Sequence, residues 1–234
     1  MIEKITDTLW GIKGDTHISK WARDSKGFTV SGDAALSAAL KFIKPGDLVL
    51  DVGCNIGRHS WHYGKAVGPD GLVIGFDPNP EAIECCKFNC IGKNFEFLNY
   101  GLANTNGQAA FVESPNTGAS FLYPNVVDQS PYKVIQVRRL DDLHIYSEKT
   151  INLIKMDVEG YEVAALRGAE EKIHEAMPVM VIEVNHGALM RAGSSPKELI
   201  SLVQSYGYRC WPIPVHAKFT DEQLDILCMP DRRP

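Results

Sequence analysis

The chain has 234 residues, of which 44% are hydrophobic, 23% are charged and 9% are aromatic. This composition is typical of globular proteins and excludes a disordered or collagen-like chain. With 24 basic and 29 acidic residues the net charge is −5, so the basic excess typical of nucleic-acid-binding proteins is missing. No stretch has the apolar length of a membrane span or of a signal-peptide core. We therefore expect one soluble, cytoplasmic domain over residues 1–234 that binds neither nucleic acid nor membrane.

Short apolar strands alternate with helices through most of the chain. Residues 1–44 are expected to form a leader that ends in a helix at 33–43. The strands expected after it lie at 48–52, 72–76, 95–98, 151–156 and 178–184, and the helices at 57–67, 80–91, 161–176 and 196–206. This alternation predicts right-handed crossovers and a parallel sheet that is covered on both faces.

Two regions break the alternation. Residues 106–147 contain turn residues and one short strand at 134–140, and we expect an insertion near the cleft. Residues 207–215 and 224–230 read as two strands that close the sheet, one of them antiparallel. The predicted fold is α/β, a doubly wound, mostly parallel, seven-stranded Rossmann-like sheet. Its expected parts are the leader 1–44, a cofactor-binding half 45–105, the insertion 106–147 and an acceptor-side half 148–234.

The sequence DVGCNIG (51–57) joins the first strand to the first helix, where ligands bind in doubly wound sheets. Gly53 is expected to let the backbone turn and a ligand approach, and Gly57 to allow close packing of the helix. The spacing is neither that of a dinucleotide pyrophosphate loop nor that of a Walker loop. Asp51, at the strand tip, would repel a pyrophosphate and suit a ligand that carries an ammonium group.

Asp77 ends the second strand in the sequence GFDPNP. A carboxylate there can accept hydrogen bonds from both hydroxyls of a ribose, and Asn79 followed by Pro80 predicts a helix start. Asp51 and Asp77 together suit a ligand that is a nucleoside with an aminoacyl-like charge and no phosphates. S-adenosylmethionine fits this description, whereas NAD and ATP do not.

Residues 45–89 and 151–173, the second of which carries D-x-E-G followed by L-x-G-A, resemble the FkbM-type family of class I S-adenosylmethionine-dependent methyltransferases. The resemblance extends over about residues 12–230, with Cys54 where the family usually has Ala and Asp77 where it often has Glu. It implies O-methylation of a sugar or another small metabolite. N-methylation of an amide or peptide side chain, and a non-catalytic interaction module, remain as alternatives. The expected cofactor-binding residues are Asp51, Gly53, Cys54, Asn55, Ile56, Gly57, Asp77, Pro78, Gly101, Leu102 and Asp157.

A hydroxyl acceptor must lose its proton, and the candidates for this chemistry lie at the tips of the fourth and fifth strands. The expected catalytic residues are Asp157, Glu159, Glu183 and His186. Glu159 either orients the acceptor or caps the next helix. Glu183 stands in an apolar strand and needs a partner or a role, and His186 is of the residue type that most often serves as a general base. Asp157, Glu183 and Asn185 could ligate Mg²⁺, but the family is not marked by such a site and we expect no metal.

The acceptor is expected to be a small molecule or a peptide. Candidate contacts are His17 and Lys20 in the leader, Asn116 and Ser120 in the sequence NTGAS, and Asn185. Cys86 and Cys90 share a helical face with Ile83 and are expected in the core, and His59 and His62 at the surface or in packing. The sequence predicts no oligomeric state.

Overall fold

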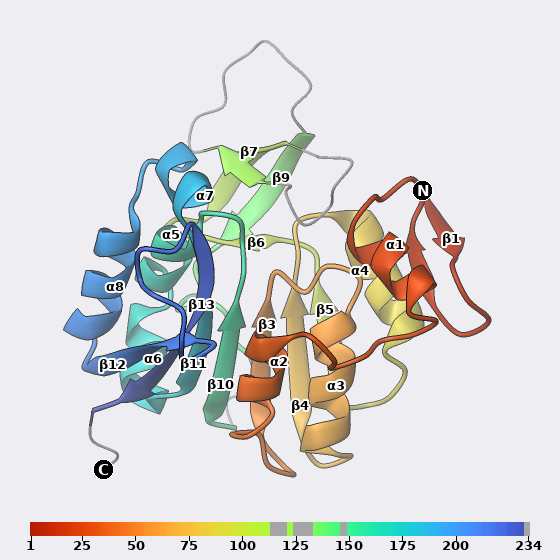
Figure 1. Ribbon diagram of the computed structural model, residues 1–234, viewed down its shortest axis with the longest axis horizontal. Coiled ribbons are helices and arrows are strands. Elements are labelled where there is room, and N and C mark those ends of the chain that lie inside the picture. The colour runs from red at the N-terminus through yellow and green to blue at the C-terminus, as the bar shows by residue number, and fades with distance from the viewer. Residues whose placement is uncertain (113–120, 124–132, 146–148, 232–234) are drawn as a thin grey trace.

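The computed structural model describes residues 1–112, 121–123, 133–145 and 149–231. A seven-stranded sheet with the order β12-β13-β11-β10-β3-β4-β5 forms its centre (Figure 1). Strand β13 runs antiparallel to the other six strands of this sheet. The predicted doubly wound fold is confirmed. The strands are β3 (Leu48–Val52), β4 (Leu72–Phe76), β5 (Phe95–Leu98), β10 (Ile151–Met156), β11 (Val179–Asn185), β12 (Tyr208–Ile213) and β13 (Gln223–Pro230).

The chain enters this sheet at its centre and then fills the two sides in turn. Strands β4 and β5 lie on one side of β3, and β10 and β11 lie on the other. The strand order therefore reverses between β3 and β10, and a ligand crevice is expected at the carboxyl ends of these two strands. Every residue of β3 is buried, including Asp51, because helices cover both faces.

Helices pack on both faces of the sheet (Figure 1). Val49 packs with α2 and α3, and the next residue, Leu50, packs with α5, α6 and α8 on the opposite face, as the alternation of a strand requires. The helices are α2 (Ala34–Ala39), α3 (Arg58–Val67) and α4 (Pro80–Asn89) on one face, α5 (Glu162–Arg167), α6 (Glu170–Ala176) and α8 (Pro196–Ser205) on the other, and α7 (His186–Arg191) directly after β11.

Several helix starts follow from local sequence. The Asn79 side chain accepts a hydrogen bond from the Glu81 N–H at 2.9 Å, and Pro80 occupies the first helical position of α4. The Ser195 hydroxyl accepts from the Glu198 N–H at 3.2 Å at the start of α8. These side chains satisfy backbone N–H groups that have no partner within the helix.

One predicted helix, 161–176, is two helices in the structure. A Cβ atom at Gly168 would lie 1.9 Å from the Ala103 carbonyl oxygen, so another segment of the chain approaches the backbone at this point. The Asp141 carboxylate accepts from the Lys172 N–H at 3.1 Å and caps α6 from outside the helix. The break therefore results from tertiary contacts, which helical periodicity alone does not reveal.

The leader contains elements that the sequence analysis did not predict. Strands β1 (Ile2–Lys4) and β2 (Trp10–Ile12) form a small antiparallel sheet, and α1 (Ile18–Asp24) follows. The Asn89 amide joins them to the main domain. It accepts from the Trp10 N–H at 2.8 Å and donates to the Trp10 and Ile56 carbonyl oxygens at 2.9 and 2.8 Å.

A second sheet lies at the carboxyl ends of the central strands (Figure 1). Its order is β6-β9-β7-β8, and only the strand at 134–140 was predicted. Asn116 and Ser120 lie outside the described residues. The strands are β6 (Gly101–Leu102), β7 (Gly107–Val112), β8 (Phe121–Tyr123) and β9 (Lys133–Arg138). Within the described chain, no helix is long and apolar enough to cross a membrane.

Gly53 makes the turn that was predicted, but its Cβ position faces the chain itself and not a ligand. Its φ is +84°, and a Cβ atom would lie 1.8 Å from the carbonyl oxygen of Asp157. The space beside Gly53 that was expected for a ligand is filled by backbone. The glycine therefore holds the β3–α3 loop against the end of β10.

We predict that Gly53→Ala lowers the free energy of unfolding by about 3 kcal/mol or more, because backbone must move as well as adopt a strained φ. Gly14→Ala is the matched control, since Gly14 has a φ of +80° and nothing within 4 Å of its Cβ position. In the control, the free energy of unfolding should fall only by the conformational cost of a side chain at positive φ, about 1–2 kcal/mol. Thermal and denaturant unfolding measure both, and equal losses in the two variants would contradict the packing role.

Candidate functional site

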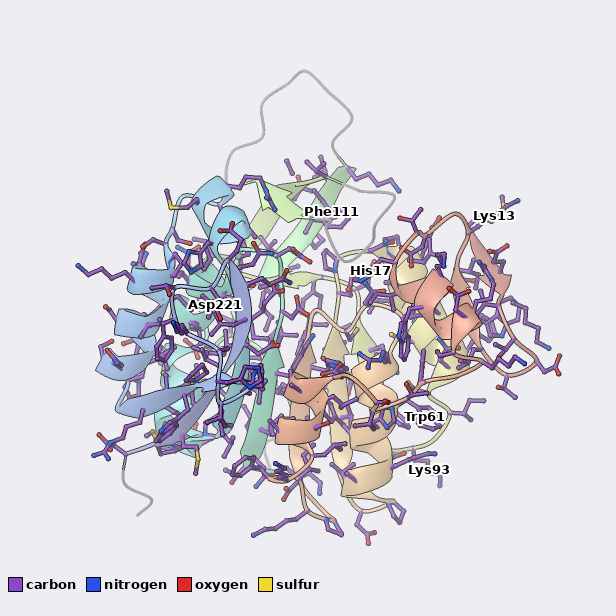
Figure 2. The ribbon with its side chains drawn as sticks, in the orientation of Figure 1. Lys13, His17, Trp61, Lys93, Phe111 and Asp221 are labelled. Carbon is purple, nitrogen blue, oxygen red and sulfur yellow. The ribbon has the colours of Figure 1, made fainter. Side chains whose placement is uncertain are left out.

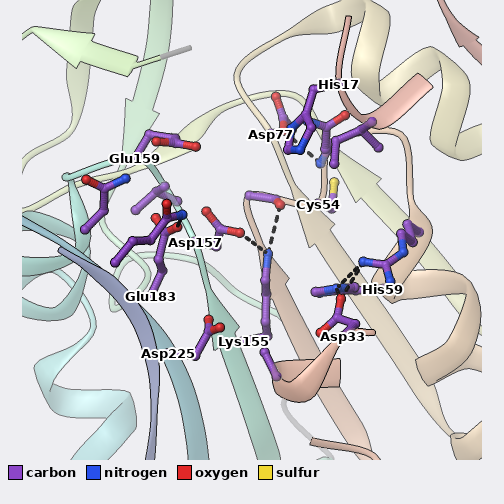
Figure 3. Close-up of a pocket in the computed structure, with 18 of the residues that line it drawn as sticks. His17, Asp33, Cys54, His59, Asp77, Lys155, Asp157, Glu159, Glu183 and Asp225 are labelled. Atoms are coloured by element: carbon purple, nitrogen blue, oxygen red, sulfur yellow. Dashed lines mark hydrogen bonds and ion pairs between the residues drawn. The ribbon is translucent and has the colours of Figure 1, made fainter. Parts of the chain in front are cut away.

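A cavity of about 960 Å³ opens at the carboxyl ends of β3, β4 and β10 (Figure 3). Its volume lies within the usual range of small-molecule sites, about 300–1,000 Å³. The leader contributes His17 to its lining, and the second sheet contributes Phe111 (Figure 2). Segments far apart in the sequence therefore enclose one space.

The β3–α3 loop forms one end of the cavity. The N–H groups of Gly53 and Cys54 both donate to the Phe76 carbonyl oxygen, at 2.9 and 3.0 Å. Asn55 has a φ of +49°, which Asn adopts more readily than most residues. Its N–H donates to the Asp77 carboxylate at 2.9 Å, so the loop and the end of β4 form one unit.

Asp77 lines the cavity beside this loop. One carboxylate oxygen accepts from the Asn55 N–H and the other from the Asn79 N–H, each at 2.9 Å. Burial raises the Asp77 pKa to about 6, although the two hydrogen bonds oppose that rise. Each oxygen keeps a further lone pair, so the carboxylate can still accept hydrogen bonds from a pair of hydroxyls.

Lys155 lies at the base of the cavity and was missed by the sequence analysis. Its ammonium group donates to the Gly53 carbonyl oxygen at 3.3 Å and lies 3.4 Å from Asp157 and 3.8 Å from Asp51. Burial alone would lower the Lys155 pKa, but the charges of Asp157 and Asp51 hold it well above its usual value. The signal in the sequence was a single lysine within the apolar strand INLIKM.

Asp51 lies behind Lys155 and does not line the cavity. Its side chain is fully buried, and one carboxylate oxygen accepts from the Ser60 hydroxyl at 2.6 Å. The predicted direct contact between Asp51 and a ligand ammonium therefore has no support in this geometry. The structure instead pairs Asp51 with a lysine of the protein.

The D-x-E-G turn after β10 directs Glu159 into the cavity. The Glu162 carboxylate, also missed by the sequence analysis, accepts from the N–H groups of Val158 and Gly160 at 3.0 and 3.2 Å. Glu162 therefore makes the capping contacts that were one alternative for Glu159. Glu159 itself has a φ of +55°, which is strained for a residue with a side chain.

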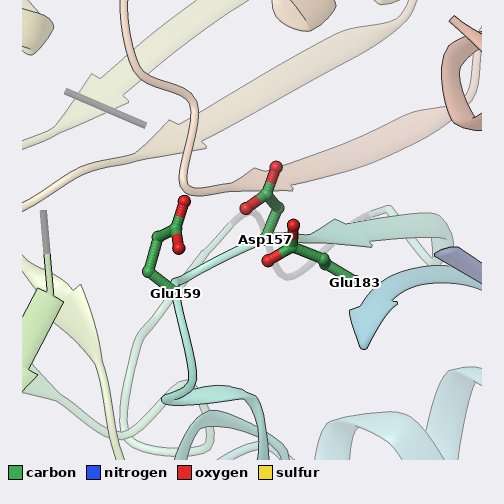
Figure 4. A group of neighbouring side chains, drawn as sticks. All are labelled: Asp157, Glu159 and Glu183. Atoms are coloured by element: carbon green, nitrogen blue, oxygen red, sulfur yellow. The ribbon is translucent and has the colours of Figure 1, made fainter. Parts of the chain in front are cut away.

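Asp157, Glu159 and Glu183 converge in the cavity (Figure 4), with one carboxylate oxygen of each within 4.8 Å of the others. The Glu183 carboxylate accepts from the Gln223 amide at 2.6 Å. Burial first, and then the charge of Asp157, raise the pKa of Glu159 to about 8 and that of Glu183 to about 10. Three carboxyl groups this close together can hold protons or bind a cation. The expected absence of a metal stays a prediction.

A second polar group lies across the cavity, on α2 and α3. Arg58 and His59 both contact the same carboxylate oxygen of Asp33, with His59 at 2.8 Å. The Arg58 guanidinium also donates to the Thr29 carbonyl oxygen at 3.0 Å and lies over the Trp21 ring. Burial would raise the Asp33 pKa, but the hydrogen bond and charge of His59, with Arg58, hold it well below its usual value. His59 was predicted to be a surface or packing residue, and it lines the cavity instead.

Many of the predicted site residues line this one cavity, and several do not. Ile56 is in the core with the leader, Gly57 packs against Cys86 and Cys90, and Lys20 pairs with Asp24. The backbone of His186 donates to the Glu222 carbonyl oxygen, and its ring is not part of the lining. The predicted residues that line the cavity are His17, Gly53, Cys54, Asn55, Asp77, Pro78, Gly101, Leu102, Asp157, Glu159, Glu183 and Asn185.

Solved structures share this fold. A crystal structure of an FkbM methyltransferase from Methylobacillus flagellatus gives a TM-score of 0.52 at 16% identity, covering 96% of this chain and 56% of that one. A TehB-like S-adenosylmethionine-dependent methyltransferase from Corynebacterium glutamicum gives 0.54 at 16% identity, covering 94% and 98%. At these identities the likeness concerns the fold alone.

Sequence comparison identifies the family. The hexuronic acid methyltransferase AglP of Haloferax volcanii is 25% identical over 159 residues, which are 67% of this chain and 61% of that protein. The chain spans less than two thirds of the length of the curated relatives it matches. The model of the FkbM methyltransferase domain matches residues 51–210, more than half of the chain. The chain therefore belongs to the FkbM methyltransferase family.

Proposed function

We propose that the protein transfers the methyl group of S-adenosylmethionine to a hydroxyl oxygen of a sugar or another small metabolite. The methyl donor supplies an activated methyl group on a sulfonium. The protein must therefore bind the donor and the acceptor, orient them, and remove the proton of the acceptor hydroxyl. The observation that carries the proposal is one cavity that holds the Asp77 carboxylate at one end and the Glu159 and Glu183 carboxyls at the other.

Asp77 and the β3–α3 loop are the proposed binding site for the nucleoside part of the donor. Gly53, Cys54 and Asn55 expose backbone along the cavity, and Asp77 offers two carboxylate oxygens beside them. In doubly wound folds, a carboxylate at the end of the second strand accepts hydrogen bonds from ribose hydroxyls. The loop's hydrogen bonds to Phe76 and Asp77 organise the site before a ligand arrives.

Glu159 is the proposed general base. A base is most effective when its pKa lies near the working pH, and burial raises the Glu159 pKa to about 8. Glu183, with a higher pKa, would carry a proton and donate a hydrogen bond to the acceptor. Turnover should rise with pH up to about 8, because the ionised form of Glu159 is the one that accepts the hydroxyl proton.

The curated relative supports a sugar as the acceptor. AglP of Haloferax volcanii is a hexuronic acid methyltransferase, and it matches 67% of this chain. The cavity is large enough for a second molecule beside the donor, and its acceptor end has polar groups from three strands, β10, β11 and β13. Labelled donor incubated with monosaccharides and glycosides, followed by mass spectrometry of the products, tests the reaction directly.

We predict that Asp77→Ala weakens binding of S-adenosylhomocysteine by about 1.5–3 kcal/mol, because charge-assisted hydrogen bonds are lost. Asp70→Ala is the control, since Asp70 is exposed and lies outside the cavity. Calorimetry on both variants, each checked by thermal unfolding, measures the effect. An unchanged dissociation constant in a folded Asp77→Ala protein would remove Asp77 from the ribose site.

We predict opposite effects of Glu159→Gly on stability and activity. Glycine accepts the φ of +55° without strain, so the free energy of unfolding should rise by about 1 kcal/mol. Turnover should fall at least about 100-fold if the base is lost. Lys26→Gly is the matched control because Lys26 is exposed and has the same φ of 55°. It should gain stability and keep its activity, and a Glu159→Gly enzyme with wild-type turnover would refute the role of Glu159.

A further inference from the structure

The acceptor end of the cavity is bounded by four carboxyl groups, Asp157, Glu159, Glu183 and Asp225, which we call the acidic wall. They come from the end of β10, the turn after it, β11 and β13 (Figure 3). Glu183 and Asp225 are direct cross-strand partners in the antiparallel pair β11–β13. Like charges opposite one another destabilise a sheet, so this arrangement has a structural cost.

The acidic wall has little positive charge to balance it. Arg58 and Lys155 are the Arg and Lys residues among the described cavity lining. Arg58 is bound to Asp33, to Thr29 and to an indole ring across the cavity. Lys155 is held by Asp51, Asp157 and the Gly53 carbonyl oxygen.

One oxygen of the acidic wall lacks a partner. Glu183 is only 6% exposed, and its first carboxylate oxygen accepts from Gln223. Its second oxygen is buried and has no hydrogen-bond partner among the described residues. Buried polar atoms are nearly always paired, and Glu183 lines the cavity. Glu183 therefore carries an unsatisfied hydrogen-bonding atom at the edge of the cavity.

The groups around the acidic wall set its range of charge. Burial first, and then Asp157 and Glu162, favour protonation of Glu159 and Glu183. Arg191 and Lys155 favour ionisation of Glu159, and the hydrogen bond from Gln223 favours ionisation of Glu183. Asn185 and Gln223 line the cavity next to it as neutral groups. Its members can hold or release protons, so the acidic wall can be neutral or negative. No change of protonation makes it positive.

We propose that the acidic wall selects a methyl acceptor that is neutral or positively charged beside the reacting atom, such as a polyol or an amino sugar, and rejects one that carries a carboxylate or phosphate there. The proposal rests on the methyl-transfer function given above. Hydroxyls can donate to ionised carboxyls and accept from protonated ones, and an ammonium group gains a counter-charge. An anion would lose its water, meet like charge wherever a carboxyl of the wall is ionised, and find no counter-charge in the wall. The hexuronic acid named for the relative is such an anion, so the two proteins should differ in acceptor.

The first test compares three methyl glycosides that differ at one position: a glucoside, a 2-amino-2-deoxyglucoside and a glucuronide. Initial rates with labelled donor should be at least about tenfold lower for the glucuronide, the scale expected of unfavourable charge contacts. Asp225→Asn should lower the ratio of the glucoside rate to the glucuronide rate, since it removes one charge of the acidic wall without changing the proposed base. Asp221→Asn, on the loop before β13 and outside the cavity, should leave the ratio unchanged (Figure 2).

Two results of this comparison would overturn the proposal. One is a glucuronide that reacts fastest in the wild-type protein. The other is a glucuronide reaction that requires Mg²⁺ and stops with EDTA, because a metal ion on the carboxylates would then supply positive charge. Glucoside or amino-sugar methylation that is insensitive to EDTA supports the proposal.

A second test needs no acceptor. Calorimetry at pH 8 compares S-adenosylhomocysteine with an analogue in which a carbon atom bearing a primary amine replaces the sulfur atom. The amine analogue should bind at least about tenfold more tightly. Asp225→Asn, which preserves the size of the side chain and removes a carboxyl whose pKa burial raises only to about 7, should reduce that preference at least threefold. Equal binding of the two analogues, or an unchanged preference in the folded variant, overturns the acidic wall as a selector of charge. If neither analogue binds, the methyl-transfer function itself fails.

Discussion

The buried ammonium group of Lys155 joins the two halves of the site. It contacts the backbone of the β3–α3 loop through Gly53 and balances Asp51 on one side and Asp157 on the other. Without it, the fully buried Asp51 carboxylate would lie in the interior without this counter-charge, which is among the most costly arrangements in a protein. The contact of Gly53 with the Asp157 carbonyl oxygen fixes the same two segments sterically. A steric contact and a charge therefore hold the β3–α3 loop and the end of β10 in a fixed relation to each other.

This constraint explains why one end of the cavity can concentrate acidic groups. Lys155 keeps Asp157 paired, and burial among like charges leaves Glu159 and Glu183 with raised pKa values of about 8 and 10. Glu162 closes the D-x-E-G turn by accepting two backbone hydrogen bonds, and Glu159 is held in a left-handed conformation that aims it into the cavity. Strain and like-charge contacts of this kind are typical of sites where function is favoured over stability.

Local signals in the sequence predicted the frame of the fold. The apolar strands 48–52 and 72–76 and the Asn79–Pro80 helix start were recognised because each depends on neighbouring residues. The break at Gly168 was missed because its cause, the Ala103 carbonyl oxygen, comes from another segment of the chain. The short strands of the leader were also missed, since three residues have no measurable periodicity.

The candidate site was only partly predictable for the same reason. Asp77 and the D-x-E-G carboxylates stand at strand ends, where a doubly wound sheet puts its ligands, and they do line the cavity. The pairing of Asp51 with Lys155 and that of His59 with Asp33 join residues 104 and 26 positions apart, and no spacing rule connects them. Glu162 looked like an ordinary first-turn residue of a helix, although it organises the turn that frees Glu159.

A structure of the protein with S-adenosylhomocysteine tests the central claim most directly, because the claim is about which end of the cavity does what. The account predicts ribose hydroxyls within hydrogen-bonding distance of Asp77, about 2.7–3.2 Å, and the thioether sulfur directed toward Glu159 and Glu183. It also predicts that Lys155 keeps its contacts with Gly53 and Asp157. A ribose bound away from Asp77, or a sulfur directed toward Arg58 and His59 across the cavity, would contradict the account.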